Sequence, residues 1–180
     1  TIQRCRLNAC NSNTTAFDGG AIRNGGGTLT VRDCLIENCA NIATGGGGGG
    51  IWLTIGTATI ERTTIRACSG SRAVGIGIVG SHGSTTIRFC AIYNNTSSDT
   101  RASVYGQTAG PHVLENCTIV NNVATNNWGG FYPISGTWTV RNNTITGNSQ
   151  QDMLPQASAT VSNNAIGNIV SGTVSSGGFN

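Results

Sequence analysis

The strongest constraint on the fold is a ten-residue pattern that occurs seven times along the chain. Its copies begin at Thr1, Thr30, Thr59, Thr86, Val113, Thr139 and Thr160, at spacings of 29, 29, 27, 27, 26 and 21 residues. The second residue of every copy is Ile, Val or Leu, and the seventh is always Ile or Leu. Whole columns of residues therefore match, which indicates a structural unit that is repeated in space.

Each copy is typical of short β-strands, because β-branched residues alternate with polar ones over a few positions. Between copies, glycines surround a second short apolar run, which predicts another strand entered through tight bends. A single unit cannot bury its own apolar face, whereas stacked units bury continuous columns. The sequence therefore predicts an all-β parallel β-helix of about seven turns, a single domain over residues 1–180. A β-sandwich of unrelated strands would not give matching columns.

The stretch from Gly19 to Asn41, GGAIRNGGGTLTVRDCLIENCAN, resembles the Gly-Gly-x-Ile repeats of right-handed parallel β-helix proteins. It is similar in particular to the polymorphic outer-membrane-protein type of bacterial surface and secreted proteins. The resemblance covers essentially the whole chain. It implies a right-handed solenoid in a surface or secreted setting, and it implies a scaffold without specifying an activity.

The seven cysteines fall into two columns of the repeat. The fifth position holds Cys5, Cys34, Cys90 and Cys117, and the tenth holds Cys10, Cys39 and Cys68. No Cys or His residues have the spacing of metal ligands, so neither a metal nor another cofactor is expected. Stacked cysteines would lie about 4.8 Å apart, which allows either buried thiols or disulfides between neighbouring turns. The disulfide alternative would pair Cys5–Cys34, Cys10–Cys39 and Cys90–Cys117 and leave Cys68 free.

Asparagine replaces cysteine in both columns toward the C-terminus. We expect these side chains to hydrogen-bond to one another and to the backbone bends, forming an asparagine ladder. The third column alternates in charge, with Arg32, Glu61, Arg88, Glu115 and Arg141 on successive copies. This alternation favours the correct register, because a shift by one turn would bring like charges together.

A polysaccharide-cleaving enzyme is the main rival interpretation, and it would need clustered carboxylates or acidic calcium ligands beside a base. Asp33 and Glu37 share one copy, but opposite charges flank each of them in adjoining copies. His82 and His112 are isolated, and the glycine run 45–50 lacks the Lys-Ser/Thr of a phosphate loop. The sequence therefore predicts no enzyme activity and no catalytic residue.

Carbohydrate binding is a further alternative, because aromatic rings stack on sugars. The aromatic residues available for it are Trp52, Trp128, Tyr132 and Trp138.

The composition limits the kinds of molecule that the chain is expected to bind. Only 9% of the residues are charged, and the 10 basic residues are all Arg and are spread singly along the chain, which does not favour nucleic acid. No apolar run approaches the roughly 20 residues of a membrane-spanning helix. Asn-x-Thr/Ser sequons occur at Asn13, Asn94, Asn95, Asn116 and Asn142. They predict either glycans on a secreted protein or a by-product of an Asn- and Thr-rich repeat.

The repeat runs to both ends of the sequence, which predicts a solenoid uncapped at both ends. If the C-terminal residues were followed by a second N-terminus, the glycines, Thr, β-branched residue and Cys would fall in phase with residues 26–34. The junction would consist of Gly177, Gly178, Phe179, Asn180, Thr1, Ile2 and Cys5. We therefore expect a structural protein of the cell surface or extracellular space that stacks head to tail with copies of itself into a filament. The alternatives are a segment of a larger adhesin or autotransporter passenger, and a β-helix that binds surface glycans or cleaves polysaccharides.

Overall fold

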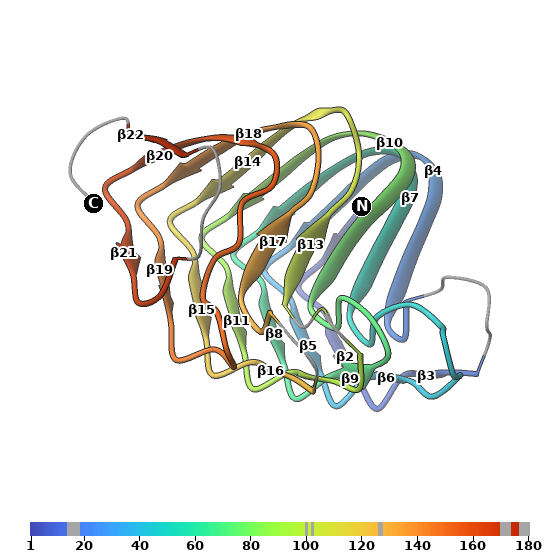
Figure 1. Ribbon diagram of the computed structural model, residues 1–180. Helices are drawn as coiled ribbons and strands as arrows, with labels where there is room; N and C mark the ends of the chain where they lie inside the picture. Colours follow the sequence, from blue (N-terminus) through green and yellow to red (C-terminus); the bar gives the residue numbers. More distant parts are fainter. Residues whose placement is uncertain (14–18, 100, 102, 126–127, 170–173, 177–180) are drawn as a thin grey trace.

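The computed structural model describes residues 1–13, 19–99, 101, 103–125, 128–169 and 174–176. In this part of the chain, β-strands joined by turns and bends wind into a parallel β-helix (Figure 1). Every strand pair is parallel and joins one turn to the next or the one before. The prediction of an all-β parallel solenoid is confirmed.

The first sheet has ten strands and carries the second column of the repeat. Eight strands follow one another along the solenoid axis: β1 (Ile2–Gln3), β4 (Ile22–Arg32), β7 (Ile51–Glu61), β10 (Ile76–Arg88), β14 (Pro111–Glu115), β18 (Thr137–Arg141), β20 (Ser158–Ser162) and β22 (Val174–Ser176). The other two, β13 (Val104–Gly106) and β17 (Phe131–Pro133), continue the first half of β10 into the next turns. Ile2 pairs with Val31 and Val31 with Ile60, as the matched columns predict.

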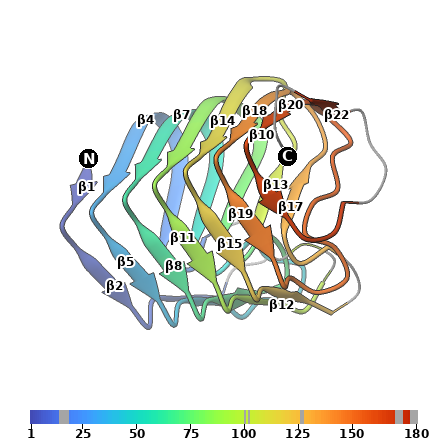
Figure 2. The same cartoon turned by 90° about the vertical axis from the view of Figure 1, so that its left-hand side faces the viewer.

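The second sheet has seven strands, one from each copy of the repeat, which lie side by side in Figure 2. They are β2 (Arg6–Asn8), β5 (Leu35–Glu37), β8 (Thr64–Arg66), β11 (Ala91–Tyr93), β15 (Thr118–Val120), β19 (Thr144–Thr146) and β21 (Ala165–Ile166). The seventh column of the repeat runs through their centres, with Ile36 paired to Ile65 and Ile92 to Ile119.

The third sheet is shorter than the other two, so fewer turns have three strands than the sequence predicts. It contains five strands: β3 (Asn11–Ser12), β6 (Ala40–Asn41), β9 (Ser69–Gly70), β12 (Thr96–Ser97) and β16 (Val123–Ala124). About five turns of the described chain therefore carry a strand in all three sheets, fewer than the seven expected. Residues 147–157, in the sixth turn, contain no strand on this face, and the spacing between the sixth and seventh copies is only 21 residues.

The hydrophobic core consists of the second and seventh columns, which face each other inside the solenoid. From the second copy to the sixth, the aliphatic side chains in both columns are fully buried, including Ile60 and Ile65. The long strands β4 and β7 bend at glycines between the two halves of the first sheet. Gly56 has φ of +96°, and a Cβ there would lie 2.0 Å from the carbonyl oxygen of Gly27, so only glycine fits this bend.

Two corners of most turns contain a residue in the left-handed conformation. The fourth position of every copy has φ between 45° and 56°, namely Arg4, Asp33, Arg62, Phe89, Asn116, Asn142 and Asn163. The ninth position repeats this at Ala9, Asn38, Ala67, Asn94, Asn121 and Gly147. Asn and Gly tolerate this conformation better than other residues, which explains part of the Asn content of the chain.

The residue after each corner points inward and joins one turn to the next. Its side chain accepts a hydrogen bond from the backbone N–H of the equivalent residue one turn earlier. Asn143 Oδ1 accepts from Cys117 N at 2.9 Å, and Asn122 Oδ1 accepts from Asn95 N at 3.1 Å. Cysteine sulfur acts in the same way, because the Cys39 N–H donates to Cys68 Sγ. We call these two columns the corner ladders; they consist of the fifth and tenth positions of the copies.

Most corner-ladder side chains also donate to a carbonyl oxygen of that same earlier turn. Asn122 Nδ2 donates to the carbonyl oxygen of Ile92 at 3.0 Å, and Cys90 Sγ donates to that of Ile60 at 3.5 Å. The tenth-position ladder ends at Asp152, whose Oδ1 accepts from Asn148 N at 2.9 Å. Buried donors and acceptors at the corners are thereby satisfied turn by turn, and the predicted asparagine ladder is present.

Replacing Asn122 by Ala tests the ladder. The change leaves Asn95 N–H and the Ile92 carbonyl without their partner, so we expect the free energy of unfolding to fall by about 2–4 kcal/mol. Asn122→Cys keeps an acceptor and a donor and should cost clearly less. Thr118→Ala, on the exposed side of the same turn, should change stability by at most about 0.5 kcal/mol. Urea unfolding measures the stability of all three variants. Equal losses of stability for Asn122→Ala and Asn122→Cys would contradict the role assigned to the ladder hydrogen bonds.

Candidate functional site

The carboxylates that could serve catalysis are held by arginines. Glu37 is 3% exposed and accepts hydrogen bonds from Arg66 Nε at 2.9 Å and from Arg6 Nε at 2.6 Å. These two guanidinium groups, Arg66 first, hold the pKa of Glu37 below its usual value. Arg62 does the same to the pKa of Asp33 through a 2.7 Å hydrogen bond.

The alternating third column also forms ion pairs. Arg88 reaches Glu61 at 2.9 Å, and Arg141 reaches Glu115 at 2.5 Å, each across one turn. Arg62 contacts the same Glu61 carboxylate. The remaining described carboxylates are Asp99, paired with Arg72 at 3.3 Å, and Asp152 at the end of the corner ladder. Ion pairing and, for Asp152, the corner ladder therefore account for the acidic residues that the structure describes.

Both histidines are buried. His112 is 1% exposed; its Nε2 lies 2.9 Å from Thr108 Oγ1, and its ring lies 4.6 Å from that of Trp138. Burial lowers the pKa of His112 to about 4 and lowers that of His82 as well. Both imidazoles are therefore neutral at pH 7.

The aromatic residues predicted to stack on sugars are mostly inaccessible. Trp138 lies inside the solenoid, where it covers Gly106; a Cβ on that glycine would meet the indole at 2.4 Å. Trp52 and Tyr132 are buried in a second cluster with Ala73, Tyr105 and Leu154. Trp128 is half-buried, with its ring 4.3 Å from that of Tyr132. Packing therefore covers three of the four candidate rings, and only Trp128 retains exposed surface on which a sugar could stack.

The cysteines are free thiols arranged in the two predicted columns. Cys5 is exposed and Cys10 partly exposed, whereas Cys34, Cys39, Cys68, Cys90 and Cys117 are buried. The hydrogen bond with Cys68 raises the pKa of Cys39, and that with Cys90 raises the pKa of Cys117. The disulfide alternative of the sequence analysis is not formed in this structure.

The sequons reflect the repeat geometry. Asn94, Asn116 and Asn142 are exposed left-handed corners, followed by a buried ladder residue and then by the Thr that begins the next strand. Asn95 is itself a ladder residue with no exposed surface, and its amide donates to Ile65 O and Asn122 Oδ1. Glycosylation of Asn95 is therefore incompatible with the folded chain. Asn13 is exposed, and the next two residues of its sequon lie outside the described residues.

The predicted junction is described only on its N-terminal side. Thr1 and Cys5 are exposed, and Ile2 is half-buried at the edge of the first sheet. Gly177, Gly178, Phe179 and Asn180 lie outside the described residues.

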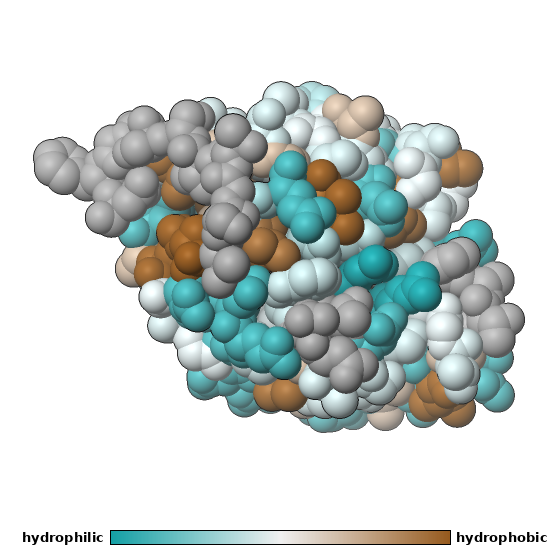
Figure 3. Space-filling view, in the orientation of Figure 1, coloured by the Kyte–Doolittle hydropathy of each residue, from teal (hydrophilic) through white to brown (hydrophobic). Residues whose placement is uncertain are grey.

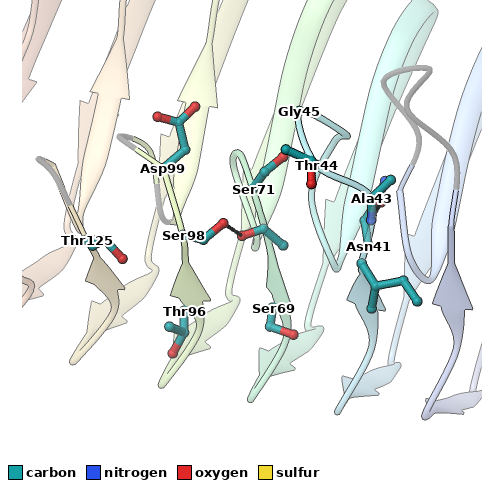
Figure 4. A pocket seen from close by; sticks show the side chains of 12 residues that line it. Asn41, Ala43, Thr44, Gly45, Ser69, Ser71, Thr96, Ser98, Asp99 and Thr125 are labelled. Atoms are coloured by element: carbon teal, nitrogen blue, oxygen red, sulfur yellow. Dashed lines mark hydrogen bonds between the residues drawn. The ribbon is translucent and has the colours of Figure 1, made fainter.

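A shallow groove of about 650 Å³ follows the third sheet, and we call it the hydroxyl groove (Figure 4). It is lined by Asn41, Ile42, Ala43, Thr44, Gly45, Ser69, Gly70, Ser71, Thr96, Ser98, Asp99 and Thr125. Several hydroxyls are already used within the fold: Ser98 Oγ donates to Gly70 O at 3.4 Å, and Thr125 Oγ1 donates to Ser97 O at 3.0 Å. These bonds join neighbouring turns at the third sheet and leave few hydroxyl groups in the groove available to bind a ligand.

A second groove, of about 460 Å³, adjoins the first through the Arg72–Asp99 ion pair. We call it the arginine groove; it is lined by Trp52, Thr54, Arg72, Val79, Gly80, Arg101, Tyr105 and Gln107. The guanidinium carbon of Arg101 lies 4.4 Å from the centre of the Tyr105 ring. The sequence did not predict this groove, because Arg72 and Arg101 lie between copies, where the residues do not align in columns.

The comparisons agree with this architecture. The family described as "Right handed beta helix region" matches residues 49–180, so the chain belongs to the right-handed β-helix family. No curated protein and no solved structure gave a significant match. The family includes both enzymes and structural proteins, so membership by itself fixes the fold and its handedness.

Two further observations concern binding. In the described ranges no three His, Cys, Asp or Glu side chains come together as a metal site would require. The same residues contain no helix with the length and apolarity to cross a membrane.

Thiol labelling distinguishes the two cysteine alternatives. We expect Cys5 and then Cys10 to react with iodoacetamide in the folded protein, and the buried thiols to react only after unfolding. Without reductant, unfolding should make all seven cysteines reactive, as mass spectrometry would show. Labelling of Cys90 and Cys117 only after reduction would establish a disulfide instead.

The buried His112 predicts a loss of stability in mild acid. Its pKa is about 4 in the folded chain and 6.5 when unfolded, so between these values only the unfolded chain takes up the proton. This contribution is fully retained above pH 6.5 and is lost as pH falls to 4, by up to about 3 kcal/mol. Urea unfolding from pH 7 to pH 4 should therefore show a smaller decline for His112→Leu than for the unchanged protein. Parallel declines would contradict this assignment.

Proposed function

We propose that this chain is a structural β-helix, a stiff rod segment whose side-chain ladders, rather than a catalytic centre, are its main functional feature. The observation that carries the proposal is the continuity of the corner ladders. The tenth-position ladder runs from Cys10 to Asp152 with at least one hydrogen bond at every step, and the fifth-position ladder continues to Asn164. Such an element resists bending and axial slip, because each turn is bonded to both neighbours.

The proposal includes head-to-tail stacking of copies into a filament. The first turn presents β1, β2 and β3 as a sheet edge paired on one side only within the described chain. Ile2 and Leu7 are half-buried there, whereas Val31 and Ile36, their neighbours in the next turn, are fully buried. This edge can accept a further turn by the same pairing, supplied by another copy or by an adjoining part of a longer polypeptide. We propose that another copy of the chain supplies this turn.

Association along the axis is also favoured over lateral association. On the face in Figure 3, hydrophobic residues lie in separate areas among hydrophilic ones. The exposed large hydrophobic residues come from different parts of the solenoid: Ile42, Ile55, Phe89, Val123 and Ile169. Scattered residues of this kind do not form a docking surface.

We further propose a cell-surface or extracellular location, with repeats of the polymorphic outer-membrane-protein type. The Gly-Gly-x-Ile pattern of residues 19–22 and the exposed sequons at Asn94, Asn116 and Asn142 support this setting. A large adhesin or autotransporter passenger would use the same rod within one longer chain.

Electron microscopy of the purified chain tests the filament. At high protein concentration we expect unbranched filaments one solenoid wide. Ile2→Asp places a charge on the half-buried edge and should abolish them, while the exposed lateral change Ser158→Asp should not. Circular dichroism checks that both variants keep the fold. A monomer at every concentration, or filaments that survive Ile2→Asp, would contradict end-to-end stacking.

A further inference from the structure

The arginine groove contains a cation that no described acidic side chain neutralises. Arg101 lines the groove, and its guanidinium rests on the face of Tyr105 at 4.4 Å. Its Nε is buried and has no hydrogen-bond partner among the described residues. No described carboxylate pairs with it, in contrast to Arg62, Arg66, Arg88 and Arg141.

A partly desolvated guanidinium without an anion is unfavourable, because water no longer fully solvates the charge. The Tyr105 ring compensates in part and also fixes the plane of the guanidinium. Fixing that plane turns the remaining N–H groups into a fork, which suits the two oxygens of a carboxylate or sulfate. The geometry of Arg101 is therefore preorganised for an oxyanion.

The other groups of the groove are consistent with such a ligand. Arg72 supplies a second guanidinium, held in place by Asp99 at 3.3 Å. The Tyr105 hydroxyl donates to Gln107 Oε1, which leaves the amide NH₂ of Gln107 as a donor in the groove. Burial raises the pKa of the Tyr105 hydroxyl, and the positive charges of Arg101 and Arg72, which line the same groove, oppose that shift.

The size of the groove indicates more than a bare ion. Its volume of about 460 Å³ lies in the range of small-molecule sites. Val79 and the largely buried Trp52 and Tyr105 side chains line the groove beside the cations. We propose that the arginine groove binds an oxyanion carried on a sugar-sized ring, with Arg101 contacting the anion and Arg72 assisting it.

Titration calorimetry on the unchanged full chain tests this proposal. The probes are glucuronate, inorganic sulfate and glucose at constant ionic strength. We expect saturable binding of glucuronate, weaker binding of sulfate because it lacks the ring, and no binding of glucose because it lacks the charge. Equal affinity for sulfate and glucuronate would overturn the part of the proposal that concerns the ring, and equal affinity for glucose would overturn the oxyanion.

Variants identify the residue responsible. Arg101→Gln should weaken glucuronate binding about 10- to 100-fold, the usual effect of losing a charged hydrogen-bonded contact. Arg101→Lys keeps the charge but loses the fork, and its effect should be intermediate. Arg141→Gln removes the same charge outside the groove and should leave affinity unchanged. Circular dichroism melting checks that each variant is folded.

Two results would overturn the assignment: no saturable binding by the unchanged protein, or equal weakening by Arg101→Gln and Arg141→Gln. The proposal is independent of the scaffold role, because a filament can form without a ligand in this groove. Failure of the binding test would therefore leave the filament proposal untouched, and the converse also holds.

Discussion

The structure depends on the hydrogen bond from a backbone N–H at each corner to the side chain one turn further along. A parallel solenoid must turn sharply at fixed intervals, and each turn buries backbone groups that no sheet can pair. A left-handed residue at the corner makes the sharp turn possible. The ladder residue directly after it pairs the backbone groups that the turn buries. The core columns then stack in register because the corners above and below are held in the same place.

Cysteine and asparagine perform this task interchangeably along one continuous column. Cys68 N donates to Asn95 Oδ1 at 2.9 Å, where the column changes from thiol to amide without a break in the bonding. Sulfur is a weaker and larger acceptor than an amide oxygen, and the thiol donates with lower strength. The amide half of the ladder therefore has the stronger bonds, while the thiol half gains more from packing apolar surface.

The sequence predicted the repeating columns because their residue types recur at matched positions. Val31, Ile60 and Ile87 pair as the alignment of copies requires, and the charges at Glu61 and Arg88 meet across one turn. It did not predict the five strands of the third sheet, because short polar segments such as Thr96–Ser97 have no distinctive pattern. It also offered Trp138 as a candidate sugar-stacking ring, although the column of Trp138 holds inward-facing residues such as Ala159. The arginine groove could not be predicted at all, because it joins residues from segments of unequal length between the copies.

Hydrogen–deuterium exchange at the ladder amides tests the central claim most directly. The account predicts that the backbone N–H groups of Asn95, Asn122 and Asn143 are as well protected as those of buried strand residues such as Ile119. Exchange at these corners as fast as in the exposed turn around Gly45 would contradict it, since the corner ladders could not then be what holds successive turns together.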